Sequence, residues 1–205
     1  MKPYYVAPPK TGSRTICDHL QLVGDHRIPS WIDVEYDYVF VSVRNPYERL
    51  VSAYHFMQKQ DSKRQERMAK GKCKHIPKRM NDKLPREHPM RHWEFFSNNC
   101  HLPFEEFIKL WLIDNADEKE NICFMPQSDW LSIDYDDMIR LESIDVDLPR
   151  VYKTITGNEL DKVKHMNKTD KEPYQTYYQD PVVVELVTNF YKEDFDKLDY
   201  EILEE

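Results

Sequence analysis

The stretch "DYVFVSVRNPYERLVSAY", residues 37–54, constrains the fold of this chain of 205 residues more than any other. Its first half contains a near-continuous apolar run over residues 39–43, as expected of a strand buried on both faces. Pro46 ends this run and opens a helical pattern at a position where its missing N–H costs no hydrogen bond. A buried strand that leads directly into a helix is typical of an α/β fold with a parallel sheet.

Further segments repeat this alternation of strand and helix. Short strands are predicted at "YYVAP" and "DMIRLE", residues 4–8 and 137–142. Apolar residues at helical spacing predict helices at residues 11–23, 103–115, 143–155 and 180–198. The predicted fold class is therefore α/β, with a central, mainly parallel sheet flanked by helices.

The charge is distributed unevenly along the chain. The formal net charge is −8, which argues against a general nucleic-acid binder. Residues 58–92 nevertheless carry twelve Lys and Arg against four Asp and Glu, a local charge of +8. We interpret this segment as a basic insertion in a single domain of residues 1–205, either as a solvated lid or as a track for an acidic glycan.

The apolar segments and the cysteines indicate the cellular compartment in which the protein is expected. No stretch approaches the roughly 18 apolar residues of a membrane span, and "MKPYYVAPPK" lacks the pattern of a signal peptide. We therefore expect a cytoplasmic protein with no membrane or nucleic-acid partner, in an oligomeric state that the sequence leaves open. Its cysteines are expected to be reduced thiols, spaced too widely for a zinc site: Cys17, Cys73, Cys100 and Cys123.

The stretch "APPKTGSRTI", residues 7–16, has the pattern of an anion-binding loop between a strand and a helix. Lys10 supplies a positive charge, and Gly12 lets the backbone approach an anion without a Cβ in the way. The first N–H groups of the helix favour negative charge at this end. Hydroxyl and guanidinium donors complete the candidate set: Thr11, Ser13, Arg14 and Thr15. A plain strand-to-helix turn is the alternative, and the lysine precedes the glycine, unlike in the common nucleotide-binding P-loop.

A second candidate anchor follows the valine-rich strand. Arg44 stands where the carboxyl edge of the sheet should open, and ligands of α/β folds bind at this edge. Ser52 follows about two helical turns later, so its hydroxyl and the Arg44 guanidinium could meet one phosphate group. The alternatives are an ordinary salt bridge for Arg44 and a surface hydroxyl for Ser52.

The two anchors together resemble the sulfotransferases that use 3′-phosphoadenosine 5′-phosphosulfate (PAPS), in particular the carbohydrate branch with the heparan uronosyl enzymes and bacterial relatives. The resemblance rests on "PKTGSRTI" followed by "VFVSVRNPYERLVSAY", and it extends to "FMPQSDWL", "RLESIDVDL" and "HMNKTDKEPY". It implies a P-loop-like three-layer fold and a first loop that holds the 5′-phosphosulfate. Arg44 and Ser52 would hold the 3′-phosphate, and Lys168 with Thr169 would close over the nucleotide.

The same resemblance implies a reaction and the residues that perform it. A sulfuryl group would pass from PAPS to an acceptor hydroxyl, leaving adenosine 3′,5′-bisphosphate (PAP), without a metal ion. Lys10 would stabilise the leaving oxygen, and His26 is the preferred general base because a neutral imidazole suits that task. Other groups stay open as the base: His55, His92, His101, His165 and Glu35.

The acceptor and the reaction class leave alternatives open. A carbohydrate is the preferred acceptor, although protein tyrosines and small alcohols also present a hydroxyl. A P-loop kinase is a rival, but it would need a lysine after the glycine and a magnesium-binding carboxylate. A non-catalytic nucleotide- or glycan-binding module of the same fold is the other rival.

Overall fold

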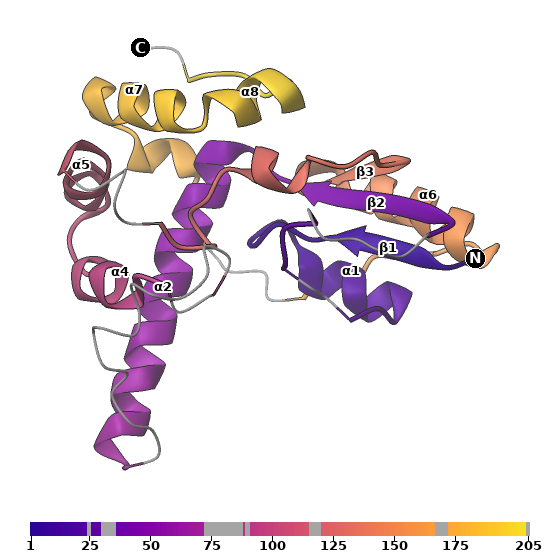
Figure 1. The fold of residues 1–205 in the computed structure, drawn as a ribbon, viewed down its shortest axis with the longest axis horizontal. Helices are drawn as coiled ribbons and strands as arrows, with labels where there is room; N and C mark the ends of the chain where they lie inside the picture. The colour runs from indigo at the N-terminus through magenta and orange to yellow at the C-terminus, as the bar shows by residue number, and fades with distance from the viewer. Residues whose placement is uncertain are drawn as a thin grey trace. The chain divides into compact units, whose positions relative to one another are not determined.

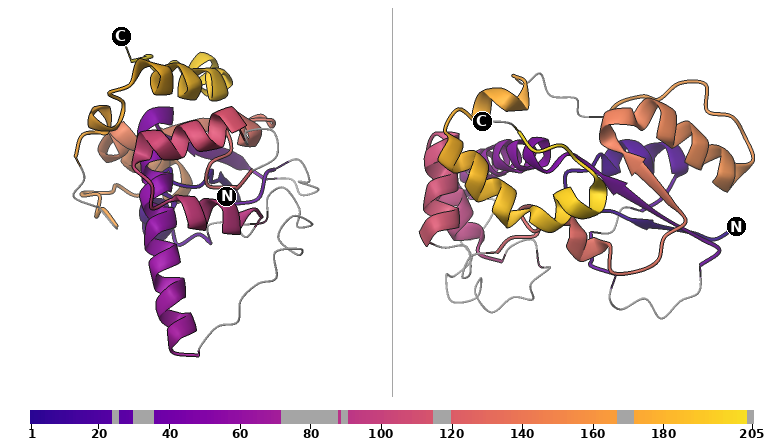
Figure 2. Two further views of the ribbon diagram at one scale, coloured as in Figure 1. Left: turned by 90° about the vertical axis from the view of Figure 1, so that its left-hand side faces the viewer. Right: turned by 90° about the horizontal axis from the view of Figure 1, so that it is seen from above.

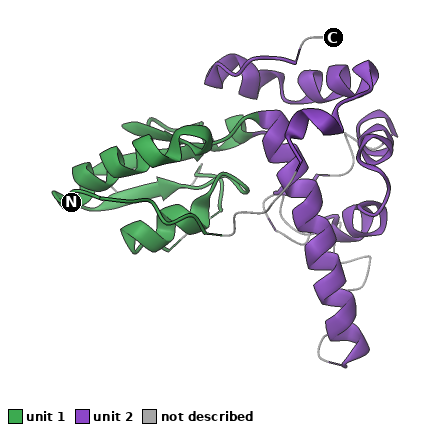
Figure 3. Cartoon of the chain, turned by 180° about the vertical axis from the view of Figure 1, so that it is seen from behind, with its two compact units in different colours: residues 1–45, 127–171 green, residues 46–126, 172–205 purple. Residues whose placement is uncertain are grey.

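The computed structural model describes residues 1–23, 26–29, 36–71, 88, 91–114, 120–166 and 172–203 (Figures 1 and 2). The chain divides into two compact units, coloured separately in Figure 3. Unit 1 comprises residues 1–45 and 127–171, and unit 2 comprises residues 46–126 and 172–205. The single domain proposed from the sequence stays a prediction, and each unit is described by itself.

Unit 1 contains a parallel sheet in the strand order β1-β2-β3. Tyr5 pairs with Phe40 across the first strand pair, and Ser42 pairs with Ile139 across the second. The three predicted strands and the α/β fold class are confirmed. The strands and helices of this unit are β1 (Pro3–Val6), α1 (Ser13–Leu20), β2 (Tyr38–Val43), η1 (Gln127–Trp130), β3 (Asp137–Arg140), η2 (Leu141–Ser143) and α6 (Ile144–Thr156).

The core of unit 1 lies between the sheet and the helices α1 and α6. Phe40 of β2 packs in one cluster with Ile16 of α1 and Leu148 of α6, and all three are fully buried. Val41 and Val43 point to the opposite face because side chains alternate along a strand. They too are fully buried, so β2 is covered on both faces, as its continuous apolar run predicted.

Unit 2 is helical and has an aromatic interior. Phe96 stacks on Phe124 with ring centroids 4.5 Å apart, and the Trp111 ring packs edge-on against both. Trp111 is 1% exposed, so it lies on the buried, apolar face of the helix predicted over residues 103–115. The elements of this unit are α2 (Pro46–Ala69), α4 (Trp93–Asn99), α5 (Phe104–Asp114), η3 (Tyr174–Tyr177), α7 (Pro181–Phe190) and α8 (Lys192–Leu198).

Two boundaries differ from the sequence prediction. The helical pattern that opens at Pro46 was expected to span residues 46–58, but α2 continues to Ala69 and so includes the start of the basic segment, whose Lys, Arg, Gln and Glu residues are good helix formers. The helix predicted over residues 180–198 is two helices, because Tyr191 leaves helical geometry with φ −101° and ψ 21°. Most of the basic segment, residues 72–87, lies outside the described residues. Within the described part of the chain, none of the helices combines the length and apolar character needed to cross a membrane.

Candidate anion site in unit 1

Two residues in the left-handed conformation shape the backbone of the loop between β1 and α1. Lys10 has φ +74° and Gly12 has φ +87°, a conformation that side chains with a Cβ rarely adopt. A Cβ on Gly12 would lie only 2.6 Å from the Leu141 Cδ1 atom. Glycine is favoured at position 12 by this conformation, and a Cβ there would also displace the end of the Leu141 side chain. The strained lysine beside it is a feature found at functional sites.

A chain of buried hydroxyl groups attaches this loop to the sheet. The Tyr5 hydroxyl lies 2.6 Å from Ser42 Oγ, which in turn lies 2.6 Å from Thr11 Oγ1. Thr11 Oγ1 also donates to the Pro8 carbonyl oxygen at 2.7 Å. Burial raises the pKa of Tyr5 far above its ordinary value, so the phenol stays protonated. The Thr11 hydroxyl is thus hydrogen-bonded to Pro8 and Ser42. Thr11 could therefore contact an anion only through its backbone N–H.

The first turn of α1 follows directly. The Gly12 carbonyl accepts from Thr15 N at 3.0 Å and from Ile16 N at 3.3 Å. The N–H groups of Ser13 and Arg14 come before these amides, and Gly12 has no side chain to cap them. Ser13 is half-buried and Arg14 is exposed. The helix N-terminus thus combines N–H donors with the positive end of its dipole, next to Lys10.

Arg44 lies at the carboxyl end of β2, against this loop. Its Nη1 donates to the Lys10 carbonyl oxygen at 3.4 Å. The buried side chain of Gln127 holds the Arg44 backbone on both sides: Gln127 Oε1 accepts from Arg44 N at 2.9 Å, and Gln127 Nε2 donates to Arg44 O at 2.8 Å. Two cationic residues predicted from separate segments are therefore neighbours in unit 1.

Glu142 supports the same strand end. Its Oε1 accepts from the backbone N–H of Asn45 at 2.7 Å. Gln127, Glu142 and Ser42 are positioning residues to which the sequence analysis gave no role. "FMPQSDWL" and "RLESIDVDL" were noted there only as parts of a resemblance. The pairings join residues 83 and 97 positions apart, so no local pattern reveals them.

His26 lies beside the start of the loop. Its Nδ1 is 2.7 Å from the Ala7 carbonyl oxygen, and its own carbonyl accepts from Trp130 Nε1 at 3.1 Å. A carbonyl oxygen can only accept, so Nδ1 carries the proton in this bond. The neutral ring then has its lone pair on Nε2, in an exposed side chain. This tautomer is the one that could accept a proton from a bound hydroxyl.

The chain that leads towards Lys168 is tied to α1. Met166 N donates to the Thr15 hydroxyl at 2.9 Å, and Lys164 N donates to His19 Nε2 at 3.1 Å. His165 Nε2 lies 2.9 Å from Asp145 Oδ1, so this imidazole is engaged in an ion pair or hydrogen bond. Lys168 and Thr169 themselves lie outside the described residues, as does Glu35, and their predicted roles stay predictions.

Ser52 and the remaining candidate bases belong to unit 2. Ser52 is a buried residue of α2, and its predicted pairing with Arg44 stays a prediction because Arg44 belongs to unit 1. His55 lies 2.8 Å from the Tyr177 hydroxyl, and His101 lies 3.1 Å from Asp61 Oδ2. His92 is buried at the start of α4. The structure thus places only His26, among the described candidates, at the loop itself.

This arrangement could hold a multiply charged anion. Lys10, Arg44 and the N-terminus of α1 gather at the carboxyl ends of β1 and β2. Across the described ranges, no group of three or more His, Cys, Asp or Glu side chains could hold a metal ion. The residues of this site offer charge stabilisation through Lys10 and Arg44, and proton acceptance at the His26 imidazole.

Comparison with models of protein families gave a match. The model of the sulfotransferase family matches residues 14–201. Neither the curated proteins nor the solved structures gave a match. The matched range includes Arg14, Thr15, His26, Arg44 and Ser52 but begins after Lys10 and the rest of the loop up to Ser13. The role of those loop residues therefore rests on their geometry.

Proposed function

Because the chain belongs to the sulfotransferase family, we propose that it transfers a sulfuryl group from PAPS to a hydroxyl group of a carbohydrate. The contact between Arg44 Nη1 and the Lys10 carbonyl oxygen carries this proposal. It joins the two segments that would bind the two ends of the donor. Sulfuryl transfer as such follows from the family, whereas the donor and the acceptor are the proposed parts.

The residues present fit a donor with several anionic groups. Lys10, Gly12, Ser13, Arg14 and Thr15 would surround the 5′-phosphosulfate, with the backbone N–H groups at the start of α1 as its main donors. Thr11 would contribute through its backbone.

The 3′-phosphate would bind at the other anchor. Arg44 would hold it through the planar fork of its guanidinium, with Ser52 as a second donor. Lys168 would close over the nucleotide from the segment that follows Met166.

The chemistry requires positioning and charge stabilisation. The acceptor oxygen attacks sulfur while the bond between sulfur and the bridging phosphate oxygen breaks, and PAP leaves with the electron pair of that bond. The proton of the acceptor hydroxyl would pass to His26 Nε2, because Nδ1 is held as a donor by Ala7. Lys10 would stabilise the charge that develops on the leaving oxygen.

A binding and transfer experiment tests the proposal. Calorimetry should detect PAP binding that is at least about tenfold tighter than AMP binding, since AMP lacks the group assigned to Arg44. Labelled PAPS, incubated with a panel of glycans, should yield a sulfated product by mass, also in the presence of EDTA. PAP binding without transfer to any acceptor would favour the non-catalytic binding module. Transfer that is lost in EDTA would contradict the metal-free mechanism.

A further inference from the structure

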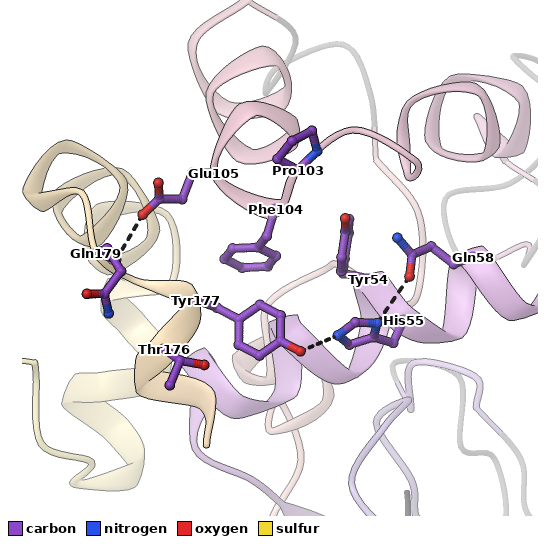
Figure 4. Close-up of a pocket in the computed structure, with 9 residues that line it drawn as sticks. All are labelled: Tyr54, His55, Gln58, Pro103, Phe104, Glu105, Thr176, Tyr177 and Gln179. Carbon is purple, nitrogen blue, oxygen red and sulfur yellow. Dashed lines mark hydrogen bonds between the residues drawn. The ribbon is translucent and has the colours of Figure 1, made fainter. Parts of the chain in front are cut away.

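Unit 2 contains a pocket whose lining residues have no role in the proposed transfer, apart from His55, which stays an alternative general base. Its volume is about 320 Å³, and it lies between α2, the start of α5 and η3 (Figure 4). This volume is at the small end of the range of ligand pockets, so it suits a single ring rather than a nucleotide. The lining residues are Tyr54, His55, Gln58, Pro103, Phe104, Glu105, Thr176, Tyr177 and Gln179.

Aromatic rings form the walls of the pocket. The Phe104 and Tyr177 rings meet edge to face with centroids 5.5 Å apart, and the Tyr54 ring packs on Phe104 at 5.3 Å. Figure 4 shows Phe104 and Tyr177 side by side, with the Tyr177 hydroxyl directed to His55. Such rings offer apolar faces to the C–H groups of a ligand, while hydroxyl and amide groups between them bind its polar groups.

The hydrogen bonds in the pocket determine what the Tyr177 hydroxyl can offer. The Gln58 Nε2 group donates to the Cys100 carbonyl at 2.7 Å, which orients the amide. Gln58 Oε1 can then only accept, so the His55 Nδ1 at 3.1 Å carries a proton. In the neutral imidazole, His55 Nε2 then accepts from the Tyr177 hydroxyl at 2.8 Å. The phenol is held as a donor to His55, and its oxygen keeps acceptor capacity for a hydroxyl group of a ligand.

The charge of the lining residues selects against acidic ligands. The lining contains one carboxylate, Glu105, and neither Lys nor Arg. Glu105 Oε1 accepts from the backbone N–H groups of Gln179 at 2.8 Å and Asp180 at 2.7 Å. The nearby Lys109 is paired with Asp180. A uronate or sulfated sugar would lose its hydration here and meet a like charge, whereas a neutral sugar would meet neither penalty.

We propose that this pocket binds one neutral pyranose unit of a glycan. The inference rests on the proposed function in so far as that glycan is the acceptor. The pyranose would pack against Phe104 and Tyr177, and one of its hydroxyl groups would donate to the Tyr177 oxygen. The acceptor would then contain neutral sugar units, whereas the basic segment, if it is a track, suggested an acidic glycan.

Ligand-observed NMR on the whole chain, without PAPS, tests the pocket. The probes are the methyl glycosides of glucose, galactose and N-acetylglucosamine, with methyl glucuronide as the charged counterpart. At least one neutral glycoside should bind in the millimolar range and at least about fivefold more tightly than the glucuronide. The Tyr177→Phe variant should weaken that binding about three- to tenfold, because it removes one hydrogen bond and keeps the ring.

Two further variants guard against misfolding and against binding elsewhere. Thr176→Arg places a large, charged side chain at an exposed position of the pocket rim and should abolish binding of the neutral glycoside. Tyr135→Phe changes a tyrosine in unit 1 that is 38% exposed, and it should leave binding unchanged. Circular dichroism checks that each variant is folded.

The outcomes separate this inference from the proposed function. If none of the neutral glycosides binds up to about 50 mM, a concentration that would reveal even very weak sites, the inference is wrong, whether or not sulfuryl transfer occurs. It is equally wrong if binding persists in both Tyr177→Phe and Thr176→Arg, or if the glucuronide binds as well as the neutral sugars. Binding that depends on the pocket supports the inference even if transfer from PAPS fails, in which case only the function is overturned.

Discussion

The two units use buried side chains for different purposes. In unit 1, buried polar groups such as Ser42, Thr11 and Gln127 hold a loop and a strand end in place by hydrogen bonds. In unit 2, the interior is a cluster of aromatic rings, of which Phe96 and Phe124 form the centre. Hydrogen bonds specify direction, whereas packed rings specify volume. An anion site needs such hydrogen bonds, because its N–H donors must all point at the bound anion.

The contrast extends to the two candidate sites. The anion site of unit 1 depends on cations and backbone donors, and its neighbour His26 is held by a backbone carbonyl. The pocket of unit 2 has walls of rings, and its histidine, His55, is held by side chains. If each unit has the role proposed for it, unit 1 carries the chemistry and unit 2 carries recognition. The following changes test that division, beginning with the largest expected effect.

His26→Ala should lower turnover at least about 100-fold, because general-base catalysis contributes roughly 10²–10⁴ to a rate. PAP affinity should remain unchanged, since the imidazole would contact the acceptor and not the nucleotide. Turnover with labelled PAPS and calorimetry with PAP measure the two quantities. His88→Ala is the control. A variant with full activity would remove His26 from the mechanism and direct attention to His55 or Glu35.

Phe124→Ala should lower the free energy of unfolding by about 3–5 kcal/mol, the usual cost of removing a fully buried phenylalanine side chain. Urea unfolding followed by fluorescence measures it. The matched control is Ile113→Ala on α5, whose side chain is 60% exposed, and its effect should stay within about 0.5 kcal/mol. Equal effects of the two changes would contradict the aromatic cluster as the core of unit 2.

Arg44→Ala should weaken PAP binding by about 1.5–3 kcal/mol, the contribution of a hydrogen bond to a charged group, which is roughly a 10- to 150-fold change in Kd. Arg44→Lys should recover only part of this loss, because it restores the charge but not the planar fork. Arg67→Ala, on the exposed end of α2, should have no effect. An affinity within about threefold of the original would refute the 3′-phosphate assignment.

Gly12→Ala should destabilise the protein by about 1 kcal/mol more than Gly157→Ala does, because only the first change also overpacks the structure. Both glycines have positive φ, +87° and +75°, so the conformational cost is shared. A Cβ at Gly12 would meet Leu141 Cδ1, whereas a Cβ at Gly157 would have open space around it. Thermal or urea unfolding compares the two variants.

A second substitution tests the physical reason for that difference. Leu141→Ala should remove the additional cost of Gly12→Ala, since it deletes the atom with which the new Cβ collides. If the two glycine variants are equally stable, the close approach of Leu141 to the loop is not what demands glycine.

Much of the fold could be predicted because its signals are local. The apolar runs at β1, β2 and β3 and the helical spacing in α1 and α5 each lie within one segment. The short helix α4 was missed, since it is only Trp93–Asn99 and follows a basic segment with no apolar period. The division between α7 and α8 was missed because apolar residues recur on both sides of Tyr191. The spacing of apolar residues indicates which residues are buried, but it does not show whether one helix is continuous.

The sequence by itself determined the strand–loop–helix order, the glycine and lysine of the first loop and an arginine after the valine-rich strand, because each is a property of neighbouring residues. Only the tertiary structure decided that Arg44 reaches the Lys10 carbonyl and that the Thr11 hydroxyl is used inside the loop. The same holds for the His26 proton on Nδ1, which a carbonyl 19 residues away requires. Hydrogen bonds between residues far apart in the sequence depend on which segments the fold brings together, and no local pattern contains that information.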